Sequence, residues 1–307
     1  MGWSSEEIRS ELARVSPTRR CDRLAELSAL AHTAGSLHLR GHGEIALHLD
    51  LASSAVARRA FRLLRELGVE SEIRTYRQHA FEQATRYQLH VADSPAARKV
   101  LVEAGIVSPG GGPLSRPPKR VVGRECCRAA YVRGALLGAG SVSGPRSSHL
   151  EIRCASLEAA ELLVRLAALD DVPLRARDRG RHAIAYAKSA DAIAELLALA
   201  GASDAALAVD EHAVVGAARA HANRLANADQ ANLVRASRAA HTQLRAVRQL
   251  AEEGRLDTLP LPLREIADLR ARNPSLSLRE LAAKCRPPAT KAAAHRRLAR
   301  LIRLAGL

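Results

Sequence analysis

The apolar positions of this chain follow strand and helix periods in an order that repeats once. Alternation of Ile45, Leu47 and Leu49 is typical of a strand with one buried face, and segments with helical spacing lie on either side of it. The elements predicted for the first half are a helix at 27–36, a strand at 44–51, a helix at 53–67, strands at 72–76 and 87–91, and a helix at 94–104. Those predicted for the second half are a helix at 132–141, a strand at 149–154, a helix at 156–169, strands at 172–177 and 182–187, and a helix at 189–200. The matching order indicates an internal duplication, each half being a helix, a hairpin, a helix, a hairpin and a closing helix.

Cap and turn residues support the same division. Ser53 and Ser156 are predicted N-caps of the central helix in each half, and Gly105 and Gly201 are predicted to stop the closing helices. The Gly- and Pro-rich segment 108–119 is expected to be a linker or a mobile hairpin between the halves. It lacks the G-x-x-x-x-G-K-[S/T] spacing, so it is not a phosphate-binding P-loop.

The pattern beyond residue 206 is helical throughout. A long Ala-rich helix is predicted over 207–253, and the segment from Gly254 to Pro262 interrupts the helical pattern. Three shorter helices are then predicted: one that starts at Pro262 and ends at Asn273-Pro274, one that opens at Ser277 with a capping box to Glu280, and one that begins at Thr290.

The last of these helices has an apolar face and a basic face. Ala294, Leu298 and Leu301 fall on one side, and cationic side chains occupy the opposite side. A shorter helix followed by a helix of this kind is typical of a helix-turn-helix, whose last helix enters the major groove of DNA. The residues predicted to contact DNA are Ser277, Arg279, Lys284, Thr290, Lys291, His295, Arg296, Arg297 and Arg300. Side chains in the first turns are expected nearest the base edges, and Arg300 nearer the phosphates.

The charge favours a polyanionic partner. The 307 residues carry a formal net charge of +15, and residues 276–307 hold eight Lys or Arg against the single acid Glu280. Double-stranded DNA is therefore the expected partner. The alternative for any charge run is a solvated helical face without a ligand.

The cysteines and histidines predict neither a metal nor a cofactor. The five cysteines, at positions 21, 126, 127, 154 and 285, contain no C-x-x-C pair and no zinc-finger spacing, so we expect no disulfide framework and no structural zinc. His38, His42 and His48 lack a ligand motif such as H-E-x-x-H. No signal peptide and no uncharged run of about 18 apolar residues is evident, so a cytoplasmic protein without a membrane span is expected.

The segment Val132–Ser141, of sequence VRGALLGAGS, resembles the LAGLIDADG helix of homing endonucleases, and a fainter copy, LSALAHTAGS, lies 105 positions earlier. In that family two such helices pack side by side. Small residues at Ala29, Gly134 and Gly138 allow their backbones to approach closely. The glycine near the end of each copy is expected to stop its helix in a conformation that only glycine adopts cheaply.

In that family the residue before the terminal glycine is an acid that holds the catalytic divalent metal. The corresponding residues here are Ala34 and Ala139. A methyl group cannot bind Mg²⁺, so the resemblance implies a nuclease scaffold without catalytic residues, and no enzyme activity is expected.

Several strings in order along nearly the whole chain resemble the WhiA family of bacterial DNA-binding regulators. They are LAEL at 24–27 with GSLHL at 35–39, CCR at 126–128 with RGA at 133–135 and GSVS at 140–143, NRLAN at 223–227 with ANL at 231–233, and PP at 287–288 with Lys291 and His295-Arg296. The family's usual Ser-Lys-Ser-Gly opening of the last helix is Thr-Lys-Ala-Ala here, from Thr290, which bears on base preference and not on the fold.

The resemblance implies an α+β fold: a duplicated αββαββα LAGLIDADG-like domain followed by an all-α helix-turn-helix domain. The expected boundaries are an N-terminal segment at 1–20, the degenerate LAGLIDADG-like domain at 21–205 with repeats at 21–107 and 121–205, a helical linker at 206–254, and the helix-turn-helix domain at 255–307. The implied function is sequence-specific regulation of transcription at promoters, in cell division, chromosome segregation and, where it occurs, sporulation. Another regulatory protein is a further candidate partner, and the implied location is the nucleoid within the cytoplasm.

Two other functions stay open. An active endonuclease would need Glu44 or Asp50 as a displaced carboxylate. The second alternative is an RNA-binding or splicing-assistant protein, since related scaffolds bind structured RNA without cleaving it. Arg74, Arg77 and Arg86 on the predicted strands indicate either retained weak DNA affinity or, alternatively, a surface used for docking a protein.

Overall fold

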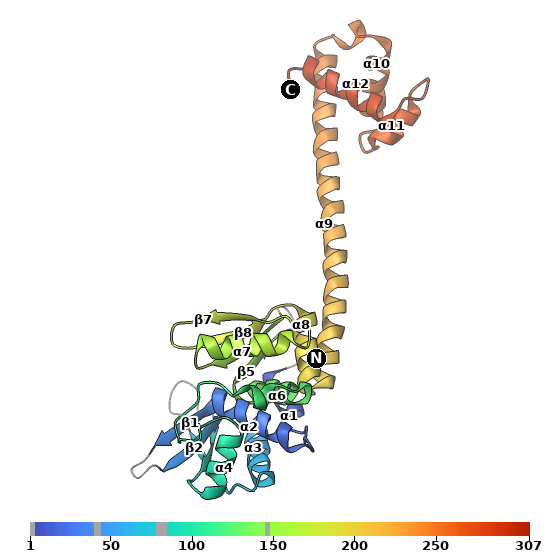
Figure 1. Cartoon of the computed structure of the whole chain (residues 1–307). Helices are drawn as coiled ribbons and strands as arrows, with labels where there is room; N and C mark the ends of the chain where they lie inside the picture. The colour runs from blue at the N-terminus through green and yellow to red at the C-terminus, as the bar shows by residue number, and fades with distance from the viewer. Residues whose placement is uncertain (1–3, 40–43, 78–84, 145–147) are drawn as a thin grey trace. The chain divides into compact units, whose positions relative to one another are not determined.

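The computed structural model describes residues 4–39, 44–77, 85–144 and 148–307, and the chain divides into two compact units, Met1–Gly216 and Ala217–Leu307 (Figure 1). The first unit opens with α1 (Ser5–Leu12), and its first repeat consists of α2 (Arg20–Ala34), β1 (Gly35–Leu39), β2 (Ile45–Leu51), α3 (Ser54–Glu66), β3 (Glu72–Arg77), β4 (Thr85–Val91) and α4 (Pro95–Glu103). After α5 (Lys119–Val122), the second repeat consists of α6 (Glu125–Ala139), β5 (Gly140–Ser143), β6 (His149–Cys154), α7 (Leu157–Ala168), β7 (Arg175–Asp178), β8 (Ala183–Ala187) and α8 (Ala190–Ala200).

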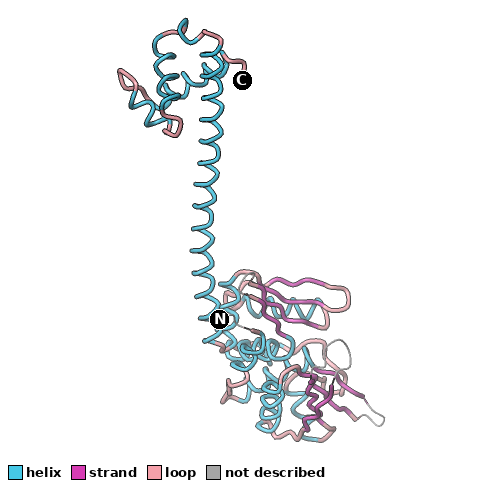
Figure 2. Tube along the Cα trace, turned by 180° about the vertical axis from the view of Figure 1, so that it is seen from behind, coloured by secondary structure: helices cyan, strands magenta, loops and turns pink. Residues whose placement is uncertain are grey.

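The duplication is confirmed by the topology of the two sheets. The first has the strand order β1-β2-β4-β3 and the second β5-β6-β8-β7, and all pairs are antiparallel. Figure 2 shows the strands as two separate groups, each accompanied by helices. Each repeat is therefore an αββαββα unit, as the resemblance implies, although β1 and β5 are not among the segments located from the apolar pattern.

The two LAGLIDADG-like helices, α2 and α6, pack against each other at the centre of the unit, and most of their residues are buried. Small residues are required along this contact, as predicted. A Cβ added at Gly134 would overlap the carbonyl oxygen of Glu26 and lie 2.9 Å from the Cβ of Ala29. One added at Gly138 would overlap the Thr33 hydroxyl. The backbones are thus too close for any larger side chain.

The predicted backbone conformation of the terminal glycines is wrong. Gly35 has φ −97° and ψ 153°, and Gly140 has φ −74° and ψ 139°, which is extended backbone open to any residue. Both glycines are needed for space instead, because a Cβ at Gly35 would overlap the carbonyl oxygen of Ala31. Each helix therefore runs straight into the first strand of its repeat.

A buried carboxylate joins the central helices to α3. Glu26 of α2 accepts hydrogen bonds from Arg59 Nε at 2.8 Å and Nη2 at 3.1 Å, and from Arg133 Nε at 2.9 Å. Glu26 and Arg59 are fully buried. Arg133 also donates to the carbonyl oxygen of Ala200 at the end of α8. One acid thus links the middle of three helices, α2 and α3 of the first repeat and α6 of the second.

The predicted caps are confirmed. Ser53 and Ser156 accept hydrogen bonds from first-turn amides of α3 and α7, and Gly105 and Gly201 have φ of +66° and +96° after α4 and α8. The interrepeat loop is a short hairpin closed by a bridge between Val107 and Pro113. Helix α1 is not among the predicted elements; it buries two apolar residues, a pattern too short to distinguish from a loop.

The rest of the chain is helical, and consists of α9 (Ser203–Glu252), the short 3₁₀ turn η2 (Leu256–Thr258), α10 (Leu261–Arg272), α11 (Leu278–Lys284) and α12 (Lys291–Leu304). In the second unit the end of α9 contributes Ala246, Val247 and Leu250 to a core shared with the last three helices. Ala294, Leu298 and Leu301 of α12 are buried in it, as the spacing predicts. Of the helices in the described ranges, none is long and apolar enough to cross a membrane.

Candidate nucleic-acid interface

Helices α11 and α12 begin at the capping residues that the sequence predicts. The Ser277 hydroxyl accepts from the Glu280 amide at 3.3 Å, and the Ser277 amide donates to the Glu280 carboxylate at 2.8 Å. Hydrogen bonding of the Ser277 side chain and of its backbone amide to the carboxylate lowers the pKa of Glu280. Thr290 caps α12 by accepting from the Ala293 amide at 3.1 Å. Both helix starts therefore have defined positions, which a side chain that reads a base edge requires.

The connections between the helices are held by residues whose roles were not predicted from the sequence. Arg270, only 2% exposed, donates to the carbonyl oxygens of Pro274 at 3.3 Å and Leu276 at 2.7 Å, in the turn before α11. Glu265 of α10 accepts from the Arg286 amide at 2.5 Å in the turn before α12. No local signal distinguishes these side chains from solvated ones, because their partners depend on how the three helices pack.

The exposed side of α12 carries uncompensated positive charge. Lys291, His295, Arg296 and Arg300 are exposed, and no ion pair links any of them to another described residue. Ser277, Arg279, Lys284 and Thr290 are exposed as well, on α11 or beside it and at the start of α12. A cation without an acidic neighbour does not have to break an ion pair when it binds a phosphate or a base. This group, with Arg297, is called the α12 surface below.

Arg297 differs from its neighbours on the α12 surface. It is half-buried, and its Nη1 is buried without a hydrogen-bond partner among the described residues. Its guanidinium lies against the Cys285 thiol. Burial raises the pKa of Cys285, and the Arg297 guanidinium acts on that pKa in the opposite direction. A contact of Arg297 with DNA thus requires its side chain to turn outward.

The positions of the missing catalytic acids lie together at the ends of α2 and α6. A Cβ added at Gly138, the residue directly before Ala139, would be 3.4 Å from the Cβ of Ala34. The strands begin at the next residues, with Gly35 opposite Leu49 and Gly140 opposite Ile152, so Asp50 and Arg153 directly follow the residues opposite these glycines. Asp50 accepts hydrogen bonds from Tyr76 at 3.2 Å and Gln88 at 3.3 Å. This strand position therefore carries a hydrogen-bonded carboxylate in the first repeat and a guanidinium in the second.

The open faces of the two sheets differ in charge. On the first sheet, alternation places Arg74 and Arg86 on the same face as Asp50 and Glu72, and Arg74 pairs with Glu72 at 2.9 Å. Arg77 falls on the other parity. The open face of the first sheet is therefore mixed in sign.

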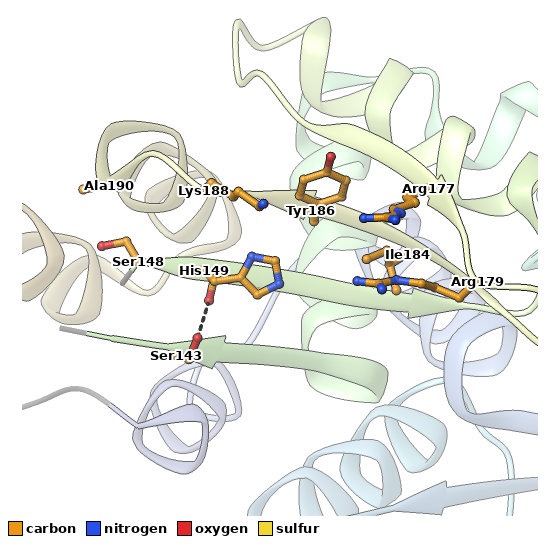
Figure 3. A pocket seen from close by; sticks show the side chains of 9 residues that line it. All are labelled: Ser143, Ser148, His149, Arg177, Arg179, Ile184, Tyr186, Lys188 and Ala190. Atoms are coloured by element: carbon orange, nitrogen blue, oxygen red, sulfur yellow. Dashed lines mark hydrogen bonds between the residues drawn. The ribbon is translucent and has the colours of Figure 1, made fainter. Parts of the chain in front are cut away.

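The open face of the second sheet is predominantly basic. Arg153, Arg175 and Arg177 share it with Tyr186, and Glu151 is the acid among them. A groove of about 670 Å³ opens there (Figure 3), lined by Ser143, Ser148, His149, Arg177, Arg179, Ile184, Tyr186, Lys188 and Ala190. The Lys188 ammonium lies 5.9 Å from the centre of the Tyr186 ring.

Two of the three histidines considered from the sequence meet on the first sheet. His38 and His48 have ring centres 4.3 Å apart, and His90 lies 4.7 Å from His48 on its other side. Burial, and then the neighbouring histidines, lower the pKa of His48. His42 lies outside the described residues.

The fold and these surfaces define a class: a degenerate LAGLIDADG scaffold followed by a helix-turn-helix unit. Three family models match the chain: the WhiA N-terminal LAGLIDADG-like domain at residues 20–107, the WhiA LAGLIDADG-like domain at 128–219 and the WhiA C-terminal HTH domain at 222–305. These matches span most of the chain.

Whole-chain relatives agree with the family models. The probable cell division protein WhiA of Heliobacterium modesticaldum is 36% identical over 303 residues, covering 98% of this chain and 95% of that protein. That of Symbiobacterium thermophilum is 35% identical over 305 residues, covering 98% and 96%. The crystal structure of full-length DUF199/WhiA from Thermatoga maritima has the same fold, with a TM-score of 0.58 at 24% identity over 100% of this chain and 98% of that one. The chain belongs to the WhiA family.

Proposed function

We propose that this protein is a sequence-specific regulator of transcription that binds duplex DNA through the α12 surface, with no catalytic activity of its own. The observation that carries the proposal is the set of exposed cations on α12, which no described acid neutralises, opposite an apolar face that anchors the helix. In a helix-turn-helix this geometry places the first turns of the last helix at base edges and the later turns at phosphates.

The relatives' names support a narrower role. They are called probable cell division proteins, and we extend this to control of genes for cell division, chromosome segregation and, where it occurs, sporulation, acting at promoters. A DNA ligand of this kind implies a location on the nucleoid in the cytoplasm. A second regulatory protein as partner fits a scaffold that lost its catalytic acids but kept its fold.

The first test is selection of bound fragments from a random duplex library by the full chain at near-physiological salt. A consensus sequence is expected, and retention without any consensus would refute sequence-specific binding. Arg296→Ala is expected to weaken binding to the selected site by about 1–3 kcal/mol if the side chain reads a base, or to flatten the salt dependence by about one unit if it contacts phosphate.

Arg272→Ala is the matched control, because it removes one exposed positive charge from the end of α10 in the same unit. We expect its effect to be small beside that of Arg296→Ala. Equal effects of the two variants would mean that net charge alone drives binding. Arg297→Ala distinguishes a DNA contact of Arg297 from its packing against Cys285. Loss of the packing would lower the stability of the DNA-free protein, whereas loss of a DNA contact would not.

A second DNA contact is favoured by the basic open face of the second sheet. Arg177 and Arg179 line its groove from β7 and the turn after it (Figure 3). The double variant Arg177→Ala/Arg179→Ala is expected to weaken binding to all sequences alike and to reduce the salt slope, without changing the consensus. An altered consensus would instead assign base reading to this sheet.

The endonuclease alternative has a direct assay. Ala34 and Ala139 offer no metal ligand, so supercoiled DNA in Mg²⁺ should remain uncut after repurification of the protein. Nicking that is abolished by Asp50→Asn would support the endonuclease alternative. Stronger binding of folded RNA than of the selected duplex would favour the RNA-binding alternative.

A further inference from the structure

Three cysteines and one aspartate meet at the starting ends of the two central helices. They are Cys21 and Asp22 in the first turn of α2, and Cys126 and Cys127 in the first turn of α6. Cys126 and Cys127 lie 105 positions after Cys21 and Asp22, the same interval that separates the two LAGLIDADG-like helices. The duplication therefore brings two equivalent pairs face to face.

The distances among the four ligand atoms suit a tetrahedral cation. Cys126 Sγ and Cys127 Sγ are 3.9 Å apart, and Asp22 Oδ1 lies 3.4 Å from Cys21 Sγ and 3.7 Å from Cys127 Sγ. All four atoms lie within 4.8 Å of one another. With Zn–S bonds of 2.3 Å and Zn–O bonds near 2.1 Å, the edges of a ligand tetrahedron are about 3.5–3.8 Å. Closing the longest edges requires movements of about 1 Å.

Asp22 is a second, independent indication that this cluster can bind a cation. It is 9% exposed, yet its carboxylate forms no ion pair with any described residue. Its Oδ1 accepts hydrogen bonds from two thiols, those of Cys21 and Cys127, which are weak donors. A buried carboxylate usually has a cationic partner, because burial of an unpaired charge is costly. Nothing in the described residues supplies one within salt-bridge distance.

The surroundings favour thiolates once a cation is present. Cys21 and Cys126 sit in the first turns of α2 and α6, whose N-caps, Arg19 and Arg124, make no side-chain capping hydrogen bond, so the positive ends of both helix dipoles face the sulfurs. The Arg19 guanidinium hydrogen-bonds to Cys126, which raises the pKa of Arg19. Binding of a cation to these sulfurs displaces the thiol protons.

We propose that Cys21, Asp22, Cys126 and Cys127 form a structural site for a tetrahedral zinc ion, which joins the first turns of α2 and α6. Three thiolates with one carboxylate oxygen form a set suited to a borderline-soft, redox-inert cation rather than to Mg²⁺ or Ca²⁺. All four positions of the tetrahedron are filled by protein, so the ion holds helices together and activates no water. The proposal is independent of DNA binding.

The sequence alone does not predict structural zinc, because zinc motifs are identified by ligands that lie a few residues apart in the chain. Here two ligands follow each other directly in each helix, and the two pairs are 105 positions apart. Only the packing of α2 against α6 brings them within reach of one ion.

The test uses the full chain, purified in a non-thiol reductant without chelator. We expect about one zinc per chain by elemental analysis. After removal of the zinc, added Co²⁺ should give the strong visible bands of a tetrahedral thiolate complex, which Zn²⁺ displaces. Cys127→Ser is expected to weaken Co²⁺ binding by about tenfold or more, whereas Cys154→Ser, at a buried cysteine of β6, should leave it unchanged.

Alkylation provides a readout that does not depend on variants. Cys21 and Cys126 are half-buried, so Zn²⁺ should slow their modification in the wild-type chain, and a chelator should restore it. Zinc should also raise the unfolding temperature of the first unit, since a ligand bound only by the folded state stabilises it. Zinc content below one-tenth of an equivalent together with no Co²⁺ bands would overturn the proposal, as would a native disulfide within the cluster or Co²⁺ bands that persist in Cys127→Ser.

Discussion

The buried carboxylate of Glu26 supports two guanidinium groups, so its neutralisation is expected to destabilise the first unit strongly. Glu26→Gln keeps the volume of the side chain and removes only its charge. Oε1 accepts from Arg59, and Oε2 accepts from both Arg59 and Arg133. Whichever way the amide turns, its NH₂ group faces a guanidinium N–H, and two nearly fully buried cations lose their counter-charge.

Removal of one partner from a buried ion pair costs about 3–5 kcal/mol, and with two guanidinium groups affected we expect the loss to lie at the upper end of this range. The assay is urea unfolding followed by tyrosine fluorescence. All four tyrosines, at 76, 87, 131 and 186, lie in the first unit, so this signal reports that unit alone. The midpoint should fall by about 1–2 M urea.

Glu103→Gln is the matched control. Glu103 pairs with Arg20 at 2.6 Å, but the two side chains are 33% and 50% exposed, so its loss should cost less than about 1 kcal/mol. If Glu26→Gln shifted the midpoint no more than Glu103→Gln, the argument that burial makes the Glu26 network essential would be refuted.

Three further predictions concern packing, pH and capping. Gly134→Ala should destabilise the first unit by about 1–3 kcal/mol, because its Cβ would overlap the Glu26 carbonyl oxygen; an unchanged urea midpoint would contradict the close helix contact. Burial lowers the pKa of His32 against the opposing effect of hydrogen bonds to the carbonyl oxygens of Ser28 and Leu114, so the unfolded chain binds this proton more readily, and stability should fall as pH drops from about 6.5 through the lower pKa of the folded state. This slope should shrink in His32→Gln, and equal slopes would dismiss His32 as its source. Ser277→Ala should speed amide hydrogen exchange in α11 by removing a cap worth about 1 kcal/mol, whereas Ser275→Ala, two residues earlier and outside the capping box, should not.

The sequence is most informative where structure is local. The repeated order of strands and helices, the caps at Ser53, Ser156 and Ser277, and the apolar face of α12 all follow from contacts between residues a few positions apart. The loss of both catalytic acids is likewise a statement about single positions, Ala34 and Ala139. These features could be predicted because hydrophobic period and capping chemistry operate within one element.

Features that depend on long-range packing were not predictable. Arg59 and Arg296 are both arginines on amphipathic helices, yet one is fully buried against Glu26 and the other is exposed. Arg297 follows Arg296 directly, yet it is half-buried, with its guanidinium beside the Cys285 thiol.

The sequence by itself therefore determined the duplicated α+β scaffold, the helix-turn-helix and the charge of its last helix, since each is encoded in neighbouring positions. Tertiary structure alone decided which charges pair in the core, which sheet face is basic, and that Cys21 and Asp22 meet Cys126 and Cys127. The physical reason is the close approach of α2 and α6: their small residues let the two backbones touch, and this contact brings together side chains that the chain keeps a hundred residues apart.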